Sequence, residues 1–341
     1  MFFIEEADHN FEIHVTKSFQ FINGSAPPVR IGYGTTSLMA VQSGQERLQL
    51  LECAYEAGIR HFDTAPYYGY GEAERVLGEF LREKRNQVTV TTKFGIQPPS
   101  VVRNRFVNQL ARKILGVAPS LRSLLSQKAQ NLSKTGSFSA EAARKSLEQS
   151  LKSLRTDRID LYLLHEPSLT DAASPEIHDF LQDEVRRGTI LAYGCGGEFP
   201  TIREIALNGL PTSQWLQFED NVLAPHVREI RALGPNCITY RTFLKALPVV
   251  SEWLSANPSI RSEWDIQLNL KLMNEGVLPA LLLGLSMLAN DEGIVLFSSS
   301  RCARIRDAAR LADGKVFSKE QIQEFAKLIS PKIKDLSCDG E

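Results

Sequence analysis

The 341-residue sequence predicts an α/β protein built as one (β/α)8 TIM barrel, with an N-terminal extension and a long helical insertion after its third strand. From about residue 29 onward, short β-branched runs alternate with amphipathic helical stretches, which is the pattern of a parallel sheet with crossover helices. Eight strand-like runs follow one another without a long break in composition. A doubly wound sheet with a second domain, the main alternative for a chain of this length, would be expected to show such a break.

The expected strands are short and mostly apolar. They are VRIGYGT (29–35), HFDTA (61–65), VTVTTKFG (88–95), LYLLHE (161–166), LAYGCGG (191–197), WLQFED (215–220), CITYR (237–241) and IVLFSS (294–299). In the helix after the second strand, the apolar residues 73, 76, 77, 80 and 81 form one stripe, and Glu74 is expected to lie away from it. Leucines repeat this spacing after an expected N-cap at Ser139.

Three segments fall outside the alternation. Residues 1–28 form an N-terminal extension, in which FEIHVTKSFQFING is typical of a hairpin that closes one barrel end. Residues 98–138 are inserted between the third strand and its helix, hence on the C-terminal face where barrel enzymes build their active sites. Residues 330–341 form a tail, so the whole chain is predicted to be a single barrel domain.

Composition excludes several classes of protein. A net charge of -1 disfavours a nucleic-acid-binding protein. The five cysteines are odd in number and lack a CxxC pair, which indicates a reducing, cytoplasmic environment and argues against a disulfide framework or zinc ribbon. The N-terminus does not resemble a signal peptide, and the longest apolar run, residues 276–289, is shorter than the roughly 20 residues of a membrane span. We therefore expect a soluble cytoplasmic protein with no integral membrane segment.

Polar side chains stand near the ends of three expected strands: Asp63, Lys93 and His165, with Tyr68 five residues beyond Asp63. A barrel would gather them at one mouth, where Asp63 and Lys93 can pair. The lysine charge is expected to lower the pKa of Tyr68 from about 10 and make it a general acid, while His165 orients a carbonyl oxygen. Taken singly, such residues are more often satisfied core polar groups, so this hypothesis depends on the barrel.

Three motifs resemble the signatures of the aldo-keto reductase superfamily: GIRHFDTAPYYGYGEAERVLGEFL (58–81), TVTTKFG (89–95) and RIDLYLLHEP (158–167). The resemblance runs from about residue 31 to residue 329, apart from the insertion. It implies hydride transfer between a nicotinamide dinucleotide and an aldehyde or ketone, in either direction. Tyr68 would be the proton donor, Lys93 and Asp63 would tune it, and His165 would orient the carbonyl.

The same resemblance implies a set of cofactor-binding positions. Gly34 and Thr35 match the turn after the first strand, Gln217 the glutamine that holds the carboxamide, and Tyr240 the aromatic ring that stacks on the nicotinamide. In FSSSRCARIRD (297–307), Ser299 and Arg304 match the serine and arginine of the adenosine-phosphate loop, so NADPH is expected rather than NADH. Residue by residue, Tyr240 can also be a core aromatic and Arg304 a solvated helix residue.

The sequence departs from the family pattern near the cofactor. Gly196 and Gly197 stand where a Ser-Asn pair usually holds the carboxamide, and Ser298 stands where many NADPH-dependent members have a lysine. Arg241 replaces a small residue and could reach the cofactor pyrophosphate. These changes leave open a second hypothesis, a cofactor-binding regulatory subunit with weak turnover. A metal-dependent hydrolase is disfavoured, because the strand ends offer one strong histidine where a metal site needs several ligands.

The insertion is basic. Residues 84–140 contain ten lysines and arginines and no acidic residue. Three interpretations stay open: a helix packed on the barrel with a solvated basic face, a lid that brings an anionic or lipophilic carbonyl substrate to the mouth, or a membrane-surface segment. Glu166, beside His165, is expected either to touch substrate or to pair with a neighbouring loop. The sequence specifies neither the substrate nor the oligomeric state.

Overall fold

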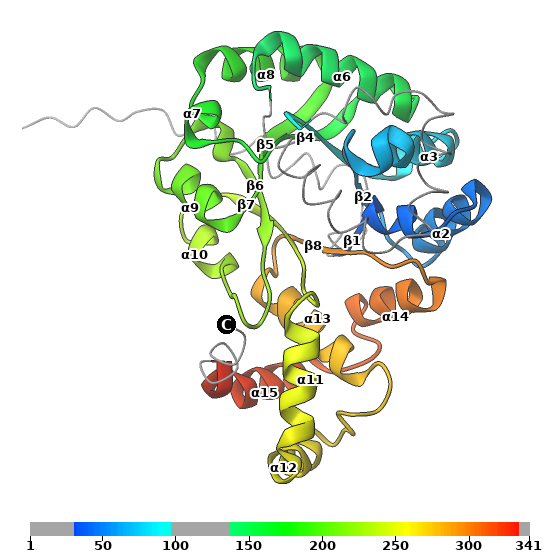
Figure 1. Cartoon of the computed structure of the whole chain (residues 1–341), viewed down its shortest axis with the longest axis vertical. Coiled ribbons are helices and arrows are strands. Elements are labelled where there is room, and N and C mark those ends of the chain that lie inside the picture. Colours follow the sequence, from blue (N-terminus) through cyan, green and yellow to red (C-terminus); the bar gives the residue numbers. More distant parts are fainter. Residues whose placement is uncertain (1–30, 97–136, 334–341) are drawn as a thin grey trace, which may run out of the picture.

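The computed structural model describes residues 31–96 and 137–333, which form a closed barrel of eight parallel strands surrounded by helices (Figure 1). Each strand pairs with the next along the chain, and the eighth pairs with the first. The predicted (β/α)8 fold is confirmed. The extension 1–28, most of the insertion 98–138 and the end of the tail lie outside the described residues.

All eight predicted strands are present. They are β1 (Ile31–Gly34), β2 (His61–Asp63), β3 (Thr89–Phe94), β4 (Ile159–His165), β5 (Ile190–Gly196), β6 (Trp215–Glu219), β7 (Asn236–Tyr240) and β8 (Ile294–Phe297). Side chains alternate between the two faces of each strand, so residues two apart point the same way. One apolar cluster, separate from the larger core shared with the helices, is made of Leu161, Leu163, Ala192, Trp215, Ile238 and Ile294.

Helices surround this sheet or pack on the helices that do. They are α2 (Gly44–Glu56), α3 (Glu72–Phe80), α6 (Ala140–Leu154), α7 (Leu169–Ala172), α8 (Pro175–Arg187), α9 (Phe199–Leu207), α10 (Val227–Arg231), α11 (Ala246–Ala256), α12 (Pro258–Leu268), α13 (Val277–Ala289), α14 (Cys302–Ala312) and α15 (Lys319–Ile329). Short 3-10 turns complete the chain: η1 (Thr35–Ala40), η2 (Tyr68–Gly71), η3 (Arg85–Gln87), η5 (Pro211–Ser213) and η6 (Ser330–Lys332). Ser139 caps α6 as predicted, since its side chain accepts a hydrogen bond from the Ala142 amide.

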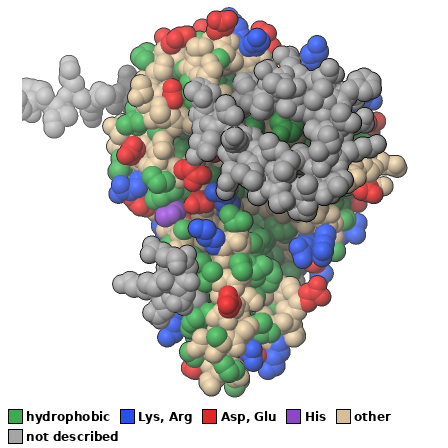
Figure 2. Space-filling view, viewed as in Figure 1, with side chains coloured by type: hydrophobic (Ala, Val, Ile, Leu, Met, Phe, Trp, Pro, Cys, Tyr) green, Lys and Arg blue, Asp and Glu red, His purple; other side chains and the backbone are tan. Residues whose placement is uncertain are grey.

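The helices α11, α12 and α15 lie together below the barrel in the view of Figure 1. Hydrophobic side chains gather on this part of the surface (Figure 2), and the exposed apolar residues Ile266 and Met273 belong to this region of the chain. The long apolar run 276–289 forms α13, whose leucines are largely buried. None of the described helices has both the length and the apolar character needed to cross a membrane.

Glu74 does not lie away from the core as its position on the helical wheel predicted. It is 1% exposed and accepts a hydrogen bond of 2.7 Å from the Thr92 hydroxyl on β3. Burial raises the pKa of Glu74, although its contacts with Thr92 and Ser150 oppose the change. Polar partners on neighbouring elements therefore make the inward orientation tolerable, and a single-helix pattern cannot show such partners.

One pair of cysteines forms a disulfide, although the cysteine pattern argued against a disulfide framework. Cys53 on α2 and Cys302 at the start of α14 form a disulfide across a sequence separation of 249 residues. Closure of the barrel pairs β1 with β8, and α2 and α14 pack side by side outside those two strands (Figure 1). The bond depends on this long-range closure, so the spacing of cysteines along the chain did not reveal it.

Candidate active site

Four predicted catalytic residues meet at the C-terminal mouth of the barrel. Asp63 ends β2, Lys93 lies one residue before the end of β3, and His165 ends β4. The Lys93 Nζ lies 2.7 Å from Asp63 Oδ1 and 5.2 Å from the centre of the Tyr68 ring. The rings of Tyr68 and His165 meet edge to face with their centres 6.1 Å apart. The structure therefore brings the four residues into one cluster.

The Asp63–Lys93 ion pair is buried, with the two residues 3% and 1% exposed. Lys93 also donates to the Thr64 carbonyl at 3.0 Å, and Gln217 Nε2 donates to Asp63 Oδ2 at 2.8 Å. Burial by itself lowers the pKa of Lys93, but the Asp63 carboxylate and the Tyr68 phenol outweigh it, so the pKa is raised. Lys93 is consequently an ammonium group throughout the neutral pH range.

A left-handed turn presents Tyr68 to this pair. Gly69, Tyr70 and Gly71 have φ values of 59°, 58° and 85°, a conformation that glycine adopts without steric cost. A side chain at Gly69 would also collide with Met39 on η1. The Tyr68 amide donates to the Ala65 carbonyl at 3.0 Å, which fixes the start of the turn. The glycines in YYGYG thus have a structural role in positioning the phenol.

The predicted lowering of the Tyr68 pKa is wrong. Burial raises the pKa of Tyr68 above its usual 10.0, and this effect exceeds the opposing influence of the Lys93 charge. Thr36 also forms a side-chain hydrogen bond with the phenol, a contact that the sequence did not reveal. Tyr68 therefore holds its proton at neutral pH, which is the protonation state that a proton donor needs.

His165 is neutral for a related reason. Burial, assisted by the Lys93 charge, lowers the pKa of His165 to about 3. A neutral imidazole has one N–H donor and one acceptor nitrogen. Its Nδ1 is buried and has no hydrogen-bond partner within residues 31–96 and 137–333. The ring is thus able to hydrogen-bond to a substrate oxygen without carrying a charge.

Residues predicted to hold a cofactor surround the same mouth. The Gly34 carbonyl accepts a 2.6 Å hydrogen bond from Ser298, the residue that stands in place of the usual lysine. The hydroxyls of Thr35 and Thr242 are buried and have no hydrogen-bond partner in the described part of the chain. The sequence did not identify Thr242 as a candidate site residue, although it directly follows Arg241. Buried hydroxyls of this kind commonly await a ligand or an ordered water.

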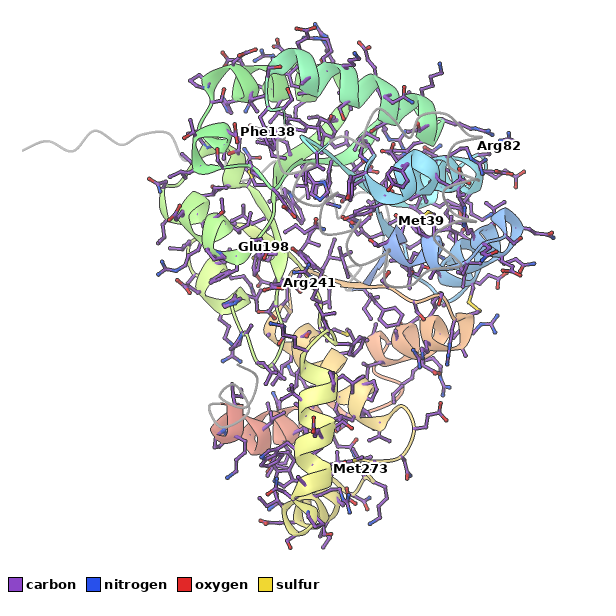
Figure 3. All side chains as sticks on the ribbon, in the orientation of Figure 1. Met39, Arg82, Phe138, Glu198, Arg241 and Met273 are labelled. Atoms are coloured by element: carbon purple, nitrogen blue, oxygen red, sulfur yellow. A yellow bond between two sulfur atoms is a disulfide. The ribbon has the colours of Figure 1, made fainter. Side chains whose placement is uncertain are left out.

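Tyr240 and Arg241 stand together at the end of β7. The Tyr240 hydroxyl donates to the Gly197 carbonyl at 3.4 Å, and the Arg241 guanidinium lies 5.5 Å from the Tyr240 ring centre. Arg241 is paired with Glu219 at 2.8 Å and with Glu198 at 3.8 Å; Figure 3 shows Glu198 and Arg241 near each other. In this arrangement the arginine is held by carboxylates beside the expected nicotinamide position.

The glycine pair at the end of β5 lies where even a Cβ would be tightly packed. A Cβ at Gly196 would lie 3.1 Å from Gln217 Oε1, and one at Gly197 would lie 3.3 Å from the Glu166 Cα. Glu166 is exposed with a φ of 57°, and its amide donates to the Gly196 carbonyl at 2.6 Å. A Cβ at either position would thus require its neighbour, the Gln217 side chain or the Glu166 backbone, to shift by a few tenths of an ångström.

The expected adenosine-phosphate segment follows β8. Ser299 is buried; its hydroxyl accepts from the Arg301 amide at 3.1 Å, and its carbonyl accepts from the Tyr33 hydroxyl at 2.8 Å. Arg304 is exposed on the first turns of α14. No group of three metal-ligating side chains gathers in the part of the chain that the structure describes. The segment is therefore anchored at Ser299, and the guanidinium of Arg304 faces solvent.

Comparison with known proteins identifies the family. The sequence model of the Aldo/keto reductase family matches residues 30–214. This chain belongs to the aldo/keto reductase family. It is 31% identical to pyridoxal 4-dehydrogenase of Microbacterium luteolum over 46% of this chain and 45% of the relative. It is 32% identical to D-threo-aldose 1-dehydrogenase of a Pseudomonas species over 49% of each chain, so the chain spans about half the length of these curated relatives.

Solved structures share the fold of this aldo/keto reductase. A glycerol dehydrogenase from Gluconobacter oxydans superposes with a TM-score of 0.62 at 18% identity, covering 90% of this chain and 94% of the other. An aldo-keto reductase from Klebsiella pneumoniae, determined in complex with NADPH, gives a TM-score of 0.57 at 19% identity over 89% and 90% of the two chains. At these identities the likeness supports the barrel alone.

Removing the carboxylate from the buried ion pair should destabilise this aldo/keto reductase. Asp63→Asn leaves the Lys93 ammonium without its counter-ion, and we expect a loss of about 3–5 kcal/mol in the free energy of unfolding at neutral pH. Urea unfolding measures the change. The matched control is Glu79→Gln, which breaks an exposed 3.5 Å pair with Arg75 and should cost less than about 0.5 kcal/mol. Equal effects of the two substitutions would contradict a stabilising buried pair.

Proposed function

We propose that this aldo/keto reductase is an NADPH-dependent carbonyl reductase that acts on an aldehyde, a ketone or a sugar hemiacetal, with Tyr68 as the proton donor. One observation carries the proposal: a protonated phenol, a neutral imidazole and a paired ammonium group converge at the mouth of the barrel. The names of two relatives refer to pyridoxal and to an aldose, which supports a carbonyl or hemiacetal substrate. Reduction and oxidation use the same groups.

The residues present fit a nicotinamide dinucleotide. Buried hydroxyls without partners at Thr35 and Thr242 flank the mouth, and the structure of a fold relative contains NADPH. The positions that would hold the cofactor are Gly34, Thr35, Gly196, Gly197, Gln217, Tyr240, Arg241, Ser299 and Arg304. The bound cofactor would supply the hydride that reaches the carbonyl carbon. NADPH is preferred over NADH because the fork of Arg304 suits a 2′-phosphate.

The protein's own groups would handle the carbonyl oxygen. Neutral His165 donates a hydrogen bond to that oxygen and orients the carbonyl, and Tyr68 transfers its proton to it as negative charge develops there. The Lys93 ammonium stabilises the phenolate that remains, because it is held 5.2 Å from the ring centre. Asp63, kept in place by Gln217, prevents the buried lysine from losing its charge.

The charged rim of the mouth favours a polar substrate. Glu166 and Arg241 are exposed there, and both have left-handed backbone conformations that hold them at the strand ends. Contact between Glu166 and substrate is part of this proposal. The role of the basic insertion, the single-domain organisation of the whole chain and a cytoplasmic location stay predictions from the sequence.

Tyr68→Phe should strongly slow carbonyl reduction. The substitution removes the proton donor and keeps the ring, so we expect kcat to fall by about 10²–10⁴-fold with little change in NADPH binding. The measurement is the loss of NADPH absorbance with a panel of aldehydes and aldoses. A kcat close to the wild-type value in the variant would refute Tyr68 as the donor. NADPH binding by the wild-type protein without turnover on any carbonyl would favour a regulatory subunit instead.

The pH profile of reduction should be flat around neutrality. Tyr68 must be protonated and its pKa lies above 10.0, so its contribution is lost only as the pH rises above about 10. His165 must be neutral and its pKa is about 3, so its contribution is lost only as the pH falls toward that value. The measurement is kcat/KM for reduction in overlapping buffers. A titration with a midpoint between about pH 6 and 8 would contradict these assignments.

Arg304→Ala should weaken the binding of NADPH and leave the binding of NADH unchanged. Loss of a charge-assisted contact with the 2′-phosphate is expected to raise the Kd for NADPH by about tenfold or more and to leave NADH binding unchanged. Fluorescence titration of the two dinucleotides measures this difference. Arg310→Ala, which removes an exposed arginine near the other end of α14, serves as the control. An equal effect of Arg304→Ala on NADPH and NADH would exclude a 2′-phosphate contact.

A further inference from the structure

The Cys53–Cys302 disulfide lies next to the segment expected to hold the cofactor. Cys302 is the first residue of α14 and follows Ser299, Ser300 and Arg301 directly. This segment is fixed on its other side, where Ser298 donates to the Gly34 carbonyl and Tyr33 donates to the Ser299 carbonyl. The disulfide joins the end of the segment to α2. Its presence thus determines whether the start of α14 is covalently attached to a second helix.

The disulfide borders a surface groove. A groove of about 490 Å³ is lined by residues of α2 and by the start of α14, among them Cys53, Cys302 and Arg306. Cys53 is 4% exposed, whereas Cys302 is half-buried. Cys302 is therefore the more accessible of the two bonded cysteines.

The other cysteines in the described ranges are in different environments. Cys195 and Cys237 are buried free thiols, and burial raises the pKa of each to about 12. A thiol with such a pKa is almost entirely protonated and is a poor nucleophile at neutral pH. Cys302, in contrast, stands at the N-terminus of α14 and lines the groove together with its bonded partner Cys53. Among these four cysteines, thiol chemistry is favoured at the Cys53–Cys302 pair.

We propose that Cys53–Cys302 is a thiol–disulfide exchange site for a small dithiol reductant, and that its redox state sets the affinity of the adjoining segment for the cofactor's adenosine phosphate. In a reducing compartment such a bond would be transient and regulatory. The effect on affinity rests on the proposed function. The exchange chemistry itself does not.

The exchange proceeds in two balanced steps. A thiolate of the dithiol attacks the Cys302 sulfur and forms a mixed disulfide; the Cys53–Cys302 bond breaks, and Cys53 leaves as a thiolate that takes up a proton. The second thiolate of the reductant then attacks its own sulfur in the mixed disulfide and releases the Cys302 thiolate at the N-terminus of α14. Two protein thiols and one oxidised, cyclic reductant result. A disulfide oxidant carries out the reverse reaction.

The oxidised form should bind the cofactor more tightly. Attachment of Cys302 to α2 restricts the start of α14, so less conformational freedom is lost when the segment closes on a phosphate. Ordering of one additional side chain in the reduced form corresponds to about a 3- to 10-fold increase in Kd. The cross-link also restricts the unfolded chain, so the oxidised protein should have the higher Tm.

The test uses the full chain, oxidised with cyclic oxidised dithiothreitol or reduced with dithiothreitol. Peptide mapping should find the Cys53–Cys302 cross-link in the oxidised sample and two alkylated cysteines in its place after reduction. We expect the Kd for NADPH to rise about 3- to 10-fold and the Tm to fall on reduction. Both redox differences should vanish in Cys53→Ser and in Cys302→Ser, and persist in Cys237→Ala.

Two results would overturn the proposal: absence of the Cys53–Cys302 cross-link from the oxidised protein, or its presence with the same NADPH affinity in both redox states. A protein that binds no NADPH in either state would contradict the proposed function instead. In that case the peptide map and the Tm difference between the oxidised and reduced protein would still test whether Cys53 and Cys302 exchange with the dithiol.

Discussion

The buried ion pair between Asp63 and Lys93 is the interaction on which the site depends. An unpaired charge in the barrel interior would be costly, and the carboxylate allows the ammonium to stay there. The Thr64 carbonyl and the Gln217 amide complete the hydrogen bonds of the pair. Together, the pair and the adjacent Tyr68 and His165 use residues of β2, β3, β4 and β6 or of the loops that follow these strands. The barrel is thus the means by which residues from separate β/α units share one charged centre.

Burial has opposite consequences for the neighbouring groups, and together these define the chemistry. It raises the pKa of Tyr68 and lowers the pKa of His165, so both are neutral, whereas the nearby carboxylate keeps Lys93 charged. A neutral donor, a neutral orienting ring and a fixed positive charge are the arrangement that reduction of a carbonyl needs. In the proposed mechanism the lysine acts mainly by stabilising the phenolate after proton transfer, since it does not bring the Tyr68 pKa below its ordinary value.

The sequence predicted the features that local patterns determine. Eight apolar runs gave eight strands, and the polar residues at their ends identified Asp63, Lys93 and His165, because parallel strands of one barrel end at one face. Features that depend on contacts between distant segments were missed or misjudged. The Gln217–Asp63 hydrogen bond, the inward turn of Glu74 and the Cys53–Cys302 disulfide each need a partner from another element. The pKa of Tyr68 depends on how deeply the fold buries the phenol relative to its distance from Lys93, and the sequence alone does not show this.

The most direct test of this account is the protonation state of Lys93. Side-chain NMR of isotopically labelled lysine, with the Lys93 signal assigned by its loss in Lys93→Met, follows Nζ through a pH titration. The ammonium signal is expected to persist beyond the ordinary lysine pKa of 10.5, because Asp63 and Tyr68 raise the pKa of the buried group. A neutral Lys93 amine at about pH 8, the behaviour of a buried lysine dominated by desolvation, would contradict it.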